Sequence, residues 1–269
     1  MATNIKETAQ RAKTKVTETV TNVKEKLDAM PKKNLILTII GMVLAIVLLS
    51  ILISVLVKRE QKKSATEKLV IDNLRKGDTP LLITAQEGLP LMNQQEYMYN
   101  LWIYVAKWES GVPRCVFFRG HVTTTSTDII IQEASPSVWI YPDTNNLYIR
   151  TEVVDDPTPN YPANVQSCGG NNATTCVQKT CDVPNFPLQK WVNIGLVLYN
   201  RTLDVYINGK LARSCVISGI PKVSNGDLYV TLNGNNFTGF EGYLSRFRIY
   251  NHSVQPEEMY KLYLEGPYS

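Results

Sequence analysis

Residues 191–211, WVNIGLVLYNRTLDVYINGKL, decide the fold that we predict for this chain. Between residues 203 and 208, aliphatic side chains at every second position alternate with Asp, Tyr and Asn. This period of two is typical of a β-strand with one face buried and the other toward solvent. Asn208-Gly209 follows and is a strong hairpin signal, because both turn residues need a positive φ. Asn200-Arg201 is the expected turn of the preceding hairpin, so the stretch predicts three consecutive antiparallel strands.

The same texture extends outward, from Leu81 to the C-terminus. Short runs rich in β-branched and aromatic residues are separated by Gly, Pro, Asn and Asp at intervals that are typical of all-β proteins. We therefore expect an all-β domain in which two antiparallel sheets form a jelly-roll sandwich. The expected strands are residues 81–84, 97–107, 115–119, 129–132, 137–141, 147–153, 192–199, 202–207, 210–216, 228–232 and 242–250.

Leu35 to Val57 is a second deciding stretch, because its 23 consecutive residues carry no charge. A helix of that length reaches about 34 Å at about 1.5 Å per residue, slightly more than the roughly 30 Å hydrocarbon core of a bilayer. We predict one transmembrane helix over residues 34–57, with Leu35 and Val57 at the ends of the span. A buried core helix seldom runs this long without a charge, and a cleaved signal peptide has a shorter apolar run that starts earlier.

The segments on either side of the span are charged. Apolar residues recur at steps of three and four from Ile5 to Met30, which predicts a basic amphipathic tail over residues 1–33. This tail would lie on a membrane surface, dock on a partner or stay disordered. Residues 58–78 have helical composition, so we expect a charged helical stalk or, alternatively, a solvated run of charges. The jelly-roll domain is then expected over residues 79–269.

Positive charge is concentrated beside the span. Residues 1–33 hold 8 Lys and Arg against 4 Asp and Glu, and residues 58–78 hold 7 against 4. The rest of the chain from Thr79 holds 13 against 16. Lys and Arg next to a span meet anionic lipid, so this charge indicates the lipid bilayer as a partner. The sequence has no Gly-rich phosphate loop, zinc-spaced Cys/His set or basic-aromatic strand pattern, so no nucleic-acid partner is expected.

Two further stretches carry a resemblance to a known family. Together with residues 191–211, the stretch FEGYLSRFRIYN at residues 240–251 resembles the laminin-G-like branch of the concanavalin A-like jelly rolls. QPEEMYKLYLEGP at residues 255–267 is similar to the short helix that closes this fold. The resemblance covers the chain from about Thr79 onward and implies the same two-sheet sandwich as the strand pattern.

Two other stretches narrow the resemblance. CDVPNFPLQKW at residues 181–191 and ARSCVISGIPK at residues 212–222 are similar to the version of this domain in proteins of large DNA viruses of algae and protists. That resemblance implies a structural protein of the virion, such as a minor capsid component anchored in the internal membrane beneath the shell. It is an analogy at the level of the fold, and a fold does not determine function.

All five cysteines lie after the span: Cys115, Cys168, Cys176, Cys181 and Cys215. They form no C-x-x-C pair, so a structural metal site is not expected. Cys181 precedes one expected strand and Cys215 ends the hairpin that follows it, so we predict a disulfide between Cys181 and Cys215. Cys168 and Cys176 would then close the loop between them, which leaves Cys115 as a buried thiol. The alternative is that all five are reduced, because disulfides persist only in oxidising compartments.

Four Asn residues begin Asn-x-Ser/Thr sequons and are glycosylation candidates: Asn172, Asn200, Asn236 and Asn251. Asn-rich turns also produce such triplets by chance. The charge rule points the other way, since 5 Lys and Arg lie within about 20 residues before the span and 7 after it. That bias slightly favours a cytoplasmic C-terminal domain, in which sequons stay unused and thiols stay reduced.

Catalytic patterns are missing from the sequence. Jelly-roll glycosidases carry closely spaced acidic residues on one strand so that acid and nucleophile share a face. Glu152, Asp155 and Asp156 lie at a strand end with a different spacing, and His121 and His252 are isolated. We therefore expect no catalytic residue, no metal site and no cofactor.

A glycan site would need an exposed aromatic ring. Trp102 and Trp139 lie within expected strands and Trp191 opens one, and a Trp in a strand usually fills the core. Trp108 lies beside Glu109 at a strand end and is the only loop candidate, so we name it as the candidate ligand contact.

These observations predict a non-catalytic single-pass membrane protein whose jelly-roll domain makes structural protein–protein contacts. In the viral version, it is a minor capsid protein that tethers the internal membrane of the virion to capsid proteins of the shell. The alternative is a cell-surface glycan-binding or adhesion protein with used sequons and formed disulfides. A membrane-bound glycosidase is a third hypothesis with the least support. Fold alone does not decide among them.

Overall fold

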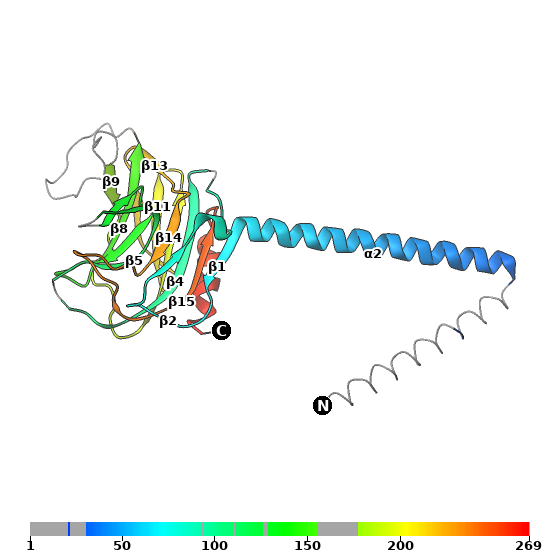
Figure 1. Cartoon of the computed structure of the whole chain (residues 1–269), viewed down its shortest axis with the longest axis horizontal. Helices are drawn as coiled ribbons and strands as arrows, with labels where there is room; N and C mark the ends of the chain where they lie inside the picture. Colours follow the sequence, from blue (N-terminus) through cyan, green and yellow to red (C-terminus); the bar gives the residue numbers. More distant parts are fainter. Residues whose placement is uncertain are drawn as a thin grey trace, which may run out of the picture. The chain divides into compact units, whose positions relative to one another are not determined.

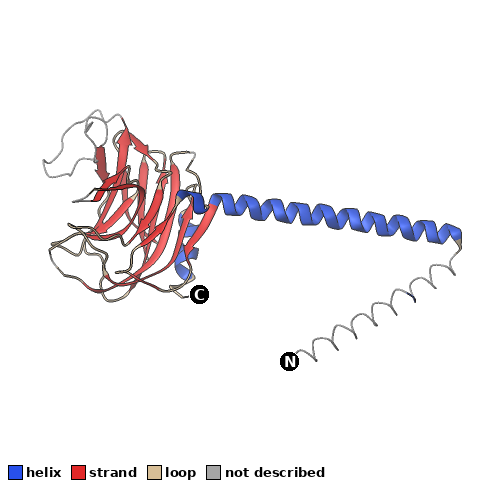
Figure 2. Cartoon of the chain, viewed as in Figure 1, coloured by secondary structure: helices blue, strands red, loops and turns tan. Residues whose placement is uncertain are grey.

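The computed structural model describes residues 21, 31–92, 94–109, 111–125, 129–154 and 177–268. The chain forms two compact units, residues 1–60 and residues 61–269. The first unit holds most of a long helix and the second is the β-domain (Figures 1 and 2). Residues 1–20 and 22–30 lie outside the described part, so the amphipathic tail over residues 1–33 stays a prediction.

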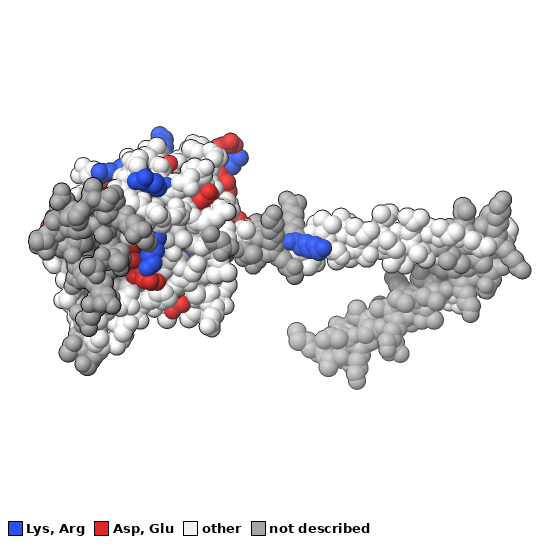
Figure 3. Space-filling model, turned by 90° about the horizontal axis from the view of Figure 1, so that it is seen from above, with Lys and Arg blue, Asp and Glu red and all other residues white. Residues whose placement is uncertain are grey.

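Helix α2 runs from Lys32 to Thr66 and contains the predicted span. Its section Ile40–Lys58 has a mean hydropathy of 3.1, and none of it is buried. In Figure 3 the described surface of this helix is mostly white, that is, uncharged. The Oγ of Ser50 donates a hydrogen bond to the carbonyl of Val47 at 2.8 Å, so the helix itself satisfies this hydroxyl. In the described part of the chain, α2 is the one helix long and apolar enough to cross a membrane.

The predicted helical stalk over residues 58–78 is wrong in its second half. Helix α2 ends at Thr66, and two short strands follow, β1 (Glu67–Ile71) and β2 (Arg75–Lys76). Both pair antiparallel with β15 (Glu241–Tyr250). The β-branched side chains of β1 pack well on a sheet, and its Ile71 is buried in the core, so pairing with β15 is favoured over continuing the helix. The β-domain therefore begins at Glu67 and not at Thr79.

The β-domain is built from strands, one 3-10 turn and one short helix. Their remaining bounds are β3 (Leu81–Ile83), η1 (Ala85–Glu87), β4 (Glu96–Lys107), β5 (Arg114–Thr124), β6 (Ile129–Gln132), β7 (Ser137–Ile140), β8 (Leu147–Val154), β9 (Val177–Thr180), β10 (Trp191–Tyr199), β11 (Thr202–Ile207), β12 (Lys210–Val216), β13 (Ile220–Lys222), β14 (Asp227–Val230) and α3 (Pro256–Leu264). Every predicted strand is present, which confirms the all-β prediction; β1, β2, β9 and β13 were not expected.

The strands form two antiparallel sheets, as predicted. The seven-stranded sheet has the order β1-β15-β4-β10-β11-β12, with β2 also paired to β15. The eight-stranded sheet has the order β13-β8-β7-β5-β14-β3, with β6 paired to β5 and β9 to β8. The main core lies between the sheets, where Tyr99, Phe117 and Phe247 are fully buried. The Phe117 ring centroid lies 5.5 Å from that of Tyr99 and 4.8 Å from that of Phe247.

The β10-β11-β12 meander has the register that the sequence predicts. Ile194 lies opposite Ile207, and Leu198 lies opposite Leu203. The turn residues Asn200, Asn208 and Gly209 have φ values of 53°, 52° and 71°. These left-handed conformations suit Asn and Gly, which is why the two turns could be placed from the sequence.

Helix α3 packs on the outer face of the seven-stranded sheet. Met259 and Leu262 of α3 are buried against Met98 of β4, Val197 of β10 and neighbouring side chains. Directly beneath the helix lies Gly195 of β10, where an added Cβ would overlap the Cε of Met259. The short closing helix that the family resemblance implies is therefore present, and a glycine in β10 makes room for it.

Aromatic side chains fill the outer face of the eight-stranded sheet. Cys115, Phe118 and Tyr229 are buried there, and Trp139 and Phe237 pack against them. The rings of Phe118 and Tyr229 stack at 4.9 Å between centroids, and Trp139 meets Phe237 edge-on at 5.2 Å. Because these rings contact one another, this cluster serves packing.

One carboxylate is buried on the same sheet. Glu152 of β8 is only 1% exposed, and its Oε1 accepts a hydrogen bond from the backbone N–H of Ala134 at 2.9 Å. Its Oε2 is buried without a hydrogen-bond partner. Burial raises the pKa of Glu152, while the ammonium of Lys222, opposite Glu152 in the β13-β8 pair, acts to lower that pKa. The folded state thus holds a proton on this carboxyl more tightly than the unfolded chain does.

Replacing Gly195 by Ala should destabilise the domain by about 1–3 kcal/mol, because the added methyl overlaps Met259 in a packed interface. Chemical unfolding of the full chain in detergent measures this cost. The matched control is the Met259→Ala background, in which the same Gly195→Ala change should cost little. If Gly195→Ala lowers the free energy of unfolding equally in the parent chain and in Met259→Ala, the contact between residue 195 and Met259 is contradicted.

Replacing Glu152 by Gln should raise the melting temperature at pH 8 and lose this effect as the pH falls below about 4, near the pKa of an unfolded Glu. A carboxyl whose pKa is raised in the folded state stabilises the fold at low pH, and this stability is lost as the pH rises and the carboxyl ionises. Gln cannot ionise, so the variant does not lose stability in this way. A carboxylate cost of about 1 kcal/mol would appear as about 2–4 °C in thermal melts. The exposed Glu241→Gln is the control. A gain at low pH only would contradict the assignment.

Candidate ligand-binding surface

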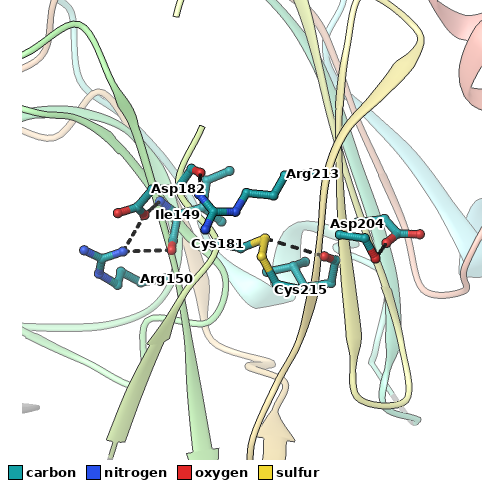
Figure 4. The surroundings of a disulfide bond; sticks show 9 residues. Ile149, Arg150, Cys181, Asp182, Asp204, Arg213 and Cys215 are labelled. Carbon is teal, nitrogen blue, oxygen red and sulfur yellow. Dashed lines mark hydrogen bonds and ion pairs between the residues drawn. A yellow bond between two sulfur atoms is a disulfide. The ribbon is translucent and has the colours of Figure 1, made fainter. Parts of the chain in front are cut away.

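A disulfide joins Cys181 to Cys215 and links the two sheets. Cys215 lies in β12 of the seven-stranded sheet. Cys181 follows β9, and its N–H donates a hydrogen bond to the carbonyl of Ile149 in β8, at 3.1 Å. The two sulfurs are 2.02 Å apart and the two Cα atoms 5.8 Å apart (Figure 4). The bridge that we predicted is thus present in the structure, and it ties the segment after β9 to the opposite sheet.

A polar network fixes the residue next to the disulfide. The Asp182 carboxylate accepts a hydrogen bond from an Arg150 guanidinium nitrogen at 2.5 Å and another from the Tyr141 hydroxyl at 2.9 Å. Arg213 of β12 donates to the Asp182 carbonyl at 2.5 Å (Figure 4). The Arg150 guanidinium also lies over the ring of Tyr148. Burial, together with the bond to Asp182, raises the pKa of Tyr141 to about 12. These groups satisfy one another, so the network holds the Cys181 segment in place.

The third described cysteine is a buried thiol. Cys115 lies in β5 with no exposed surface, and burial raises its pKa to about 12. At neutral pH this thiol stays protonated, which suits neither a nucleophile nor a metal ligand. Cys168 and Cys176 lie outside the described residues, and their pairing stays a prediction.

The glycosylation candidates differ in accessibility. Asn200, at the turn between β10 and β11, and Asn236 are both exposed. Asn251 is half-buried, and its Nδ2 donates a hydrogen bond to the carbonyl of Leu91 at 3.0 Å. Asn172 lies outside the described residues. Asn200 and Asn236 therefore offer the most accessible side-chain amides among the described candidates.

Trp108 does not stand free at the surface. Its ring is half-buried and packs against the main core. Its indole N–H donates a hydrogen bond to the carbonyl of Tyr141 at 3.1 Å. The ring thus helps to fix the loop after β4, and its role as a ligand contact stays a prediction.

The described acidic and histidine side chains do not assemble a reactive centre. Among the described residues, no group of three or more His, Cys, Asp or Glu side chains could hold a metal ion. Glu133 is ion-paired with Lys222 at 2.6 Å and lies 3.5 Å from His121. His252 stacks on Tyr250. Asp155 and Asp156 lie outside the described residues.

An aromatic surface that the sequence reading missed lies on the outer face of the seven-stranded sheet. Tyr243 of β15 is opposite Tyr104 of β4, and Tyr104 is opposite Trp191 of β10. The ring centroid of Tyr104 lies 6.5 Å from that of Tyr243 and 5.7 Å from that of Trp191. Tyr268 then meets Trp191 edge-on at 5.6 Å and accepts a hydrogen bond from its indole N–H at 2.7 Å. We call Tyr243, Tyr104, Trp191 and Tyr268 the aromatic row.

The aromatic row points away from the core because of strand alternation. Val192, Ile103 and Leu244, which flank the row along their strands, are buried in the main core. Side chains of neighbouring residues in a strand point to opposite faces, so Trp191 and Tyr104 face outward. The prediction that Trp191 fills the core is therefore wrong. The sequence does indicate its outward orientation, because Trp191 is two and four residues from Asn193 and Gly195 and so shares their face of the strand, not that of Val192.

Comparison with known proteins gives a family. Residues 118–259 match the family model Laminin_G_3, described as the concanavalin A-like lectin/glucanases superfamily. No curated protein matches the chain in sequence.

Solved structures share the fold at low identity. A crystal structure of an HCR/D mutant has a TM-score of 0.50 and 13% identity, covering 75% of this chain and 51% of that one. The receptor binding domain of botulinum neurotoxin C/D mosaic serotype has a TM-score of 0.49 and 13% identity, covering 74% of this chain and 46% of that one. This chain spans about half the length of these structures. With its matched residues forming more than half of its length, the chain belongs to the Laminin_G_3 family of the concanavalin A-like lectin/glucanases superfamily.

Proposed function

We propose that this chain is a non-catalytic recognition protein that is anchored in a membrane and presents its lectin-like jelly-roll domain on the oxidising side. The carrying observation is the disulfide between Cys181 and Cys215. Disulfides form and persist at cell surfaces and in secretory compartments, and they are rare where thiols are kept reduced. A cell-surface glycan-binding or adhesion protein is the function that fits this bridge best.

The anchor is the section Ile40–Lys58 of α2. From Ile40 to Val57 its side chains are exposed and uncharged, and nearly all are apolar, over a length that matches the hydrocarbon core of a bilayer. A water-soluble protein rarely exposes so large an apolar surface, whereas lipid solvates it. The excess of Lys and Arg on the C-terminal side argues for a cytoplasmic domain, but the difference is 7 against 5. We give the covalent bridge more weight than that small difference.

A binding role suits the described chemistry better than a catalytic one. Glu133 is neutralised by Lys222, and Glu152 is buried. A glycosidase needs two carboxyl groups flanking an accessible bond of the substrate. The superfamily description names both lectins and glucanases, and this carboxylate arrangement supports the lectin side of that pair.

The second candidate function is a structural tether between the internal membrane of a virion and its capsid proteins. The favouring observation is strand β12 at the edge of the seven-stranded sheet, which pairs only with β11 among the described strands. Its side chains are mostly exposed, and Val216 is 79% exposed. An open strand edge can pair with a strand of another protein. Finding the chain in purified virions is the test, and its absence there would end this candidate.

Peptide mapping by mass spectrometry without reductant should find Cys181 joined to Cys215 and glycan on Asn200 or Asn236 in the full chain made by eukaryotic cells. Both follow if the domain folds in a secretory compartment. The matched control carries Asn200→Gln and Asn236→Gln, and it should lose the glycan while keeping the bridge. A folded protein with free thiols and bare Asn residues would refute the proposed side of the membrane.

A further inference from the structure

We propose that the aromatic row binds carbohydrate, with an oligosaccharide lying across β15, β4 and β10 and its pyranose rings resting on Tyr243, Tyr104 and Trp191. This inference rests on the proposed function only in treating the domain as a recognition module. It assigns the ligand contact to a surface built by three strands, in place of Trp108.

Exposure makes the aromatic row available. Tyr243 is 38% exposed and Tyr268 is 62% exposed, while Tyr104 and Trp191 are partly exposed. Tyr104 is tilted by 43° against Tyr243 and by 50° against Trp191, so these rings do not stack face to face on each other. Their partly exposed surface can receive the apolar face of a sugar ring. By contrast, Phe118 and Tyr229 on the other sheet are stacked at 14° and buried.

The spacing of the row follows from the sheet. Neighbouring strands repeat at about 4.8 Å, and residues in register across three strands therefore form a straight line. The centroid distances of 6.5 Å and 5.7 Å place successive rings about one sugar unit apart. A linear oligosaccharide laid across the strands can thus meet more than one ring at once.

Polar groups interleave with the rings. The indole N–H of Trp191 already donates to a hydroxyl, that of Tyr268, at 2.7 Å. Lys76 of β2 is exposed and lies opposite Tyr243, which extends the row with an ammonium group. Rings that carry polar tips suit a ligand with an apolar face and many hydroxyls, whereas a purely apolar partner would leave those tips unsatisfied. This mixture favours carbohydrate as the occupant.

Hydrogen bonds and ion pairs hold the segment that carries Tyr268 beside the rest of the row. The Oγ of Ser245 donates to the carbonyl of Pro267 at 2.6 Å, and Arg246 donates to the carbonyl of Tyr268 at 3.0 Å. Arg246 and Arg248 also pair with Glu265. These contacts fix the last residues of the described chain beside Trp191. A surface whose side chains are already in place loses less entropy on binding.

Trp102 marks where the open part of this face ends. It lies two residues before Tyr104 on β4, so both side chains point outward. Its ring stacks on Tyr263 at 5.6 Å, yet its indole N–H is buried without a hydrogen-bond partner. Trp102 is only 5% exposed, so it belongs to the packed part of this face and borders the row without joining it.

The test uses the full chain in lipid nanodiscs on an array of neutral and sialylated oligosaccharides, followed by titration with the best binder. Tyr243→Ala should weaken binding about tenfold or more, because both the stacking contact of the ring and the hydrogen bond of its hydroxyl are lost. Trp191→Ala should weaken it at least as much. Tyr243→Phe keeps the ring and loses only the hydroxyl, so it should weaken binding less than Tyr243→Ala does.

The matched control is Tyr199→Ala. Tyr199 is 55% exposed and ends the strand that Trp191 begins, on the same face, so it should bind as the parent chain does. Near-UV circular dichroism checks that each variant is folded. If Trp191→Ala proves to be unfolded, the binding of Tyr243→Ala alone decides the test.

Three results would overturn the carbohydrate assignment. One is an array on which no sugar binds, another is binding that Tyr243→Ala leaves unchanged, and the third is binding of a proline-rich peptide instead of sugar that Tyr243→Ala abolishes. None of these results changes what peptide mapping finds for the disulfide and the glycans. The two proposals can therefore fail separately.

Discussion

The alternation of side chains along β4 is the constraint on which the rest of the structure depends. β4 lies between β15 and β10 in the seven-stranded sheet, and every second side chain from Tyr97 to Val105 is buried in the main core. The intervening side chains face outward, where Met98 receives α3, Trp102 stacks on Tyr263 and Tyr104 joins the aromatic row. A shift of one residue in register would exchange these two sets and destroy both the core and the surface.

Local signals made most of the fold predictable. Strict alternation and the turns at Asn200 and Asn208 located β10, β11 and β12, and runs of apolar residues located the longer strands. β1 was not predicted from the sequence, because a charged segment that follows a long helix has the composition of a helix. Only its pairing with β15, far away in the sequence, makes it a strand. The aromatic row was not predicted because it also depends on long-range strand pairing. Tyr243, Tyr104 and Trp191 come from three segments that are far apart in the chain.

Two regions of the sandwich have different chemistry. Near Cys181, the disulfide ties the two sheets together and the ion pair between Arg150 and Asp182 neutralises both charges. Arg213 adds a hydrogen bond to the Asp182 carbonyl. Across β15, β4 and β10, aromatic rings with polar tips stay partly open to solvent. Burial and the bonds between its groups mark the first region as structural, whereas partial exposure without face-to-face stacking is the basis on which we propose the second as a surface for recognition.

Labelling of intact cells tests whether the membrane anchor presents this domain on the oxidising side, as we propose. A chain with an epitope tag after Ser269 is expressed in eukaryotic cells and stained with a labelled antibody before and after permeabilisation. We expect strong staining of intact cells, and permeabilisation should add only the signal of the intracellular pool. Staining that requires permeabilisation, in cells where the protein reaches the plasma membrane, would contradict it.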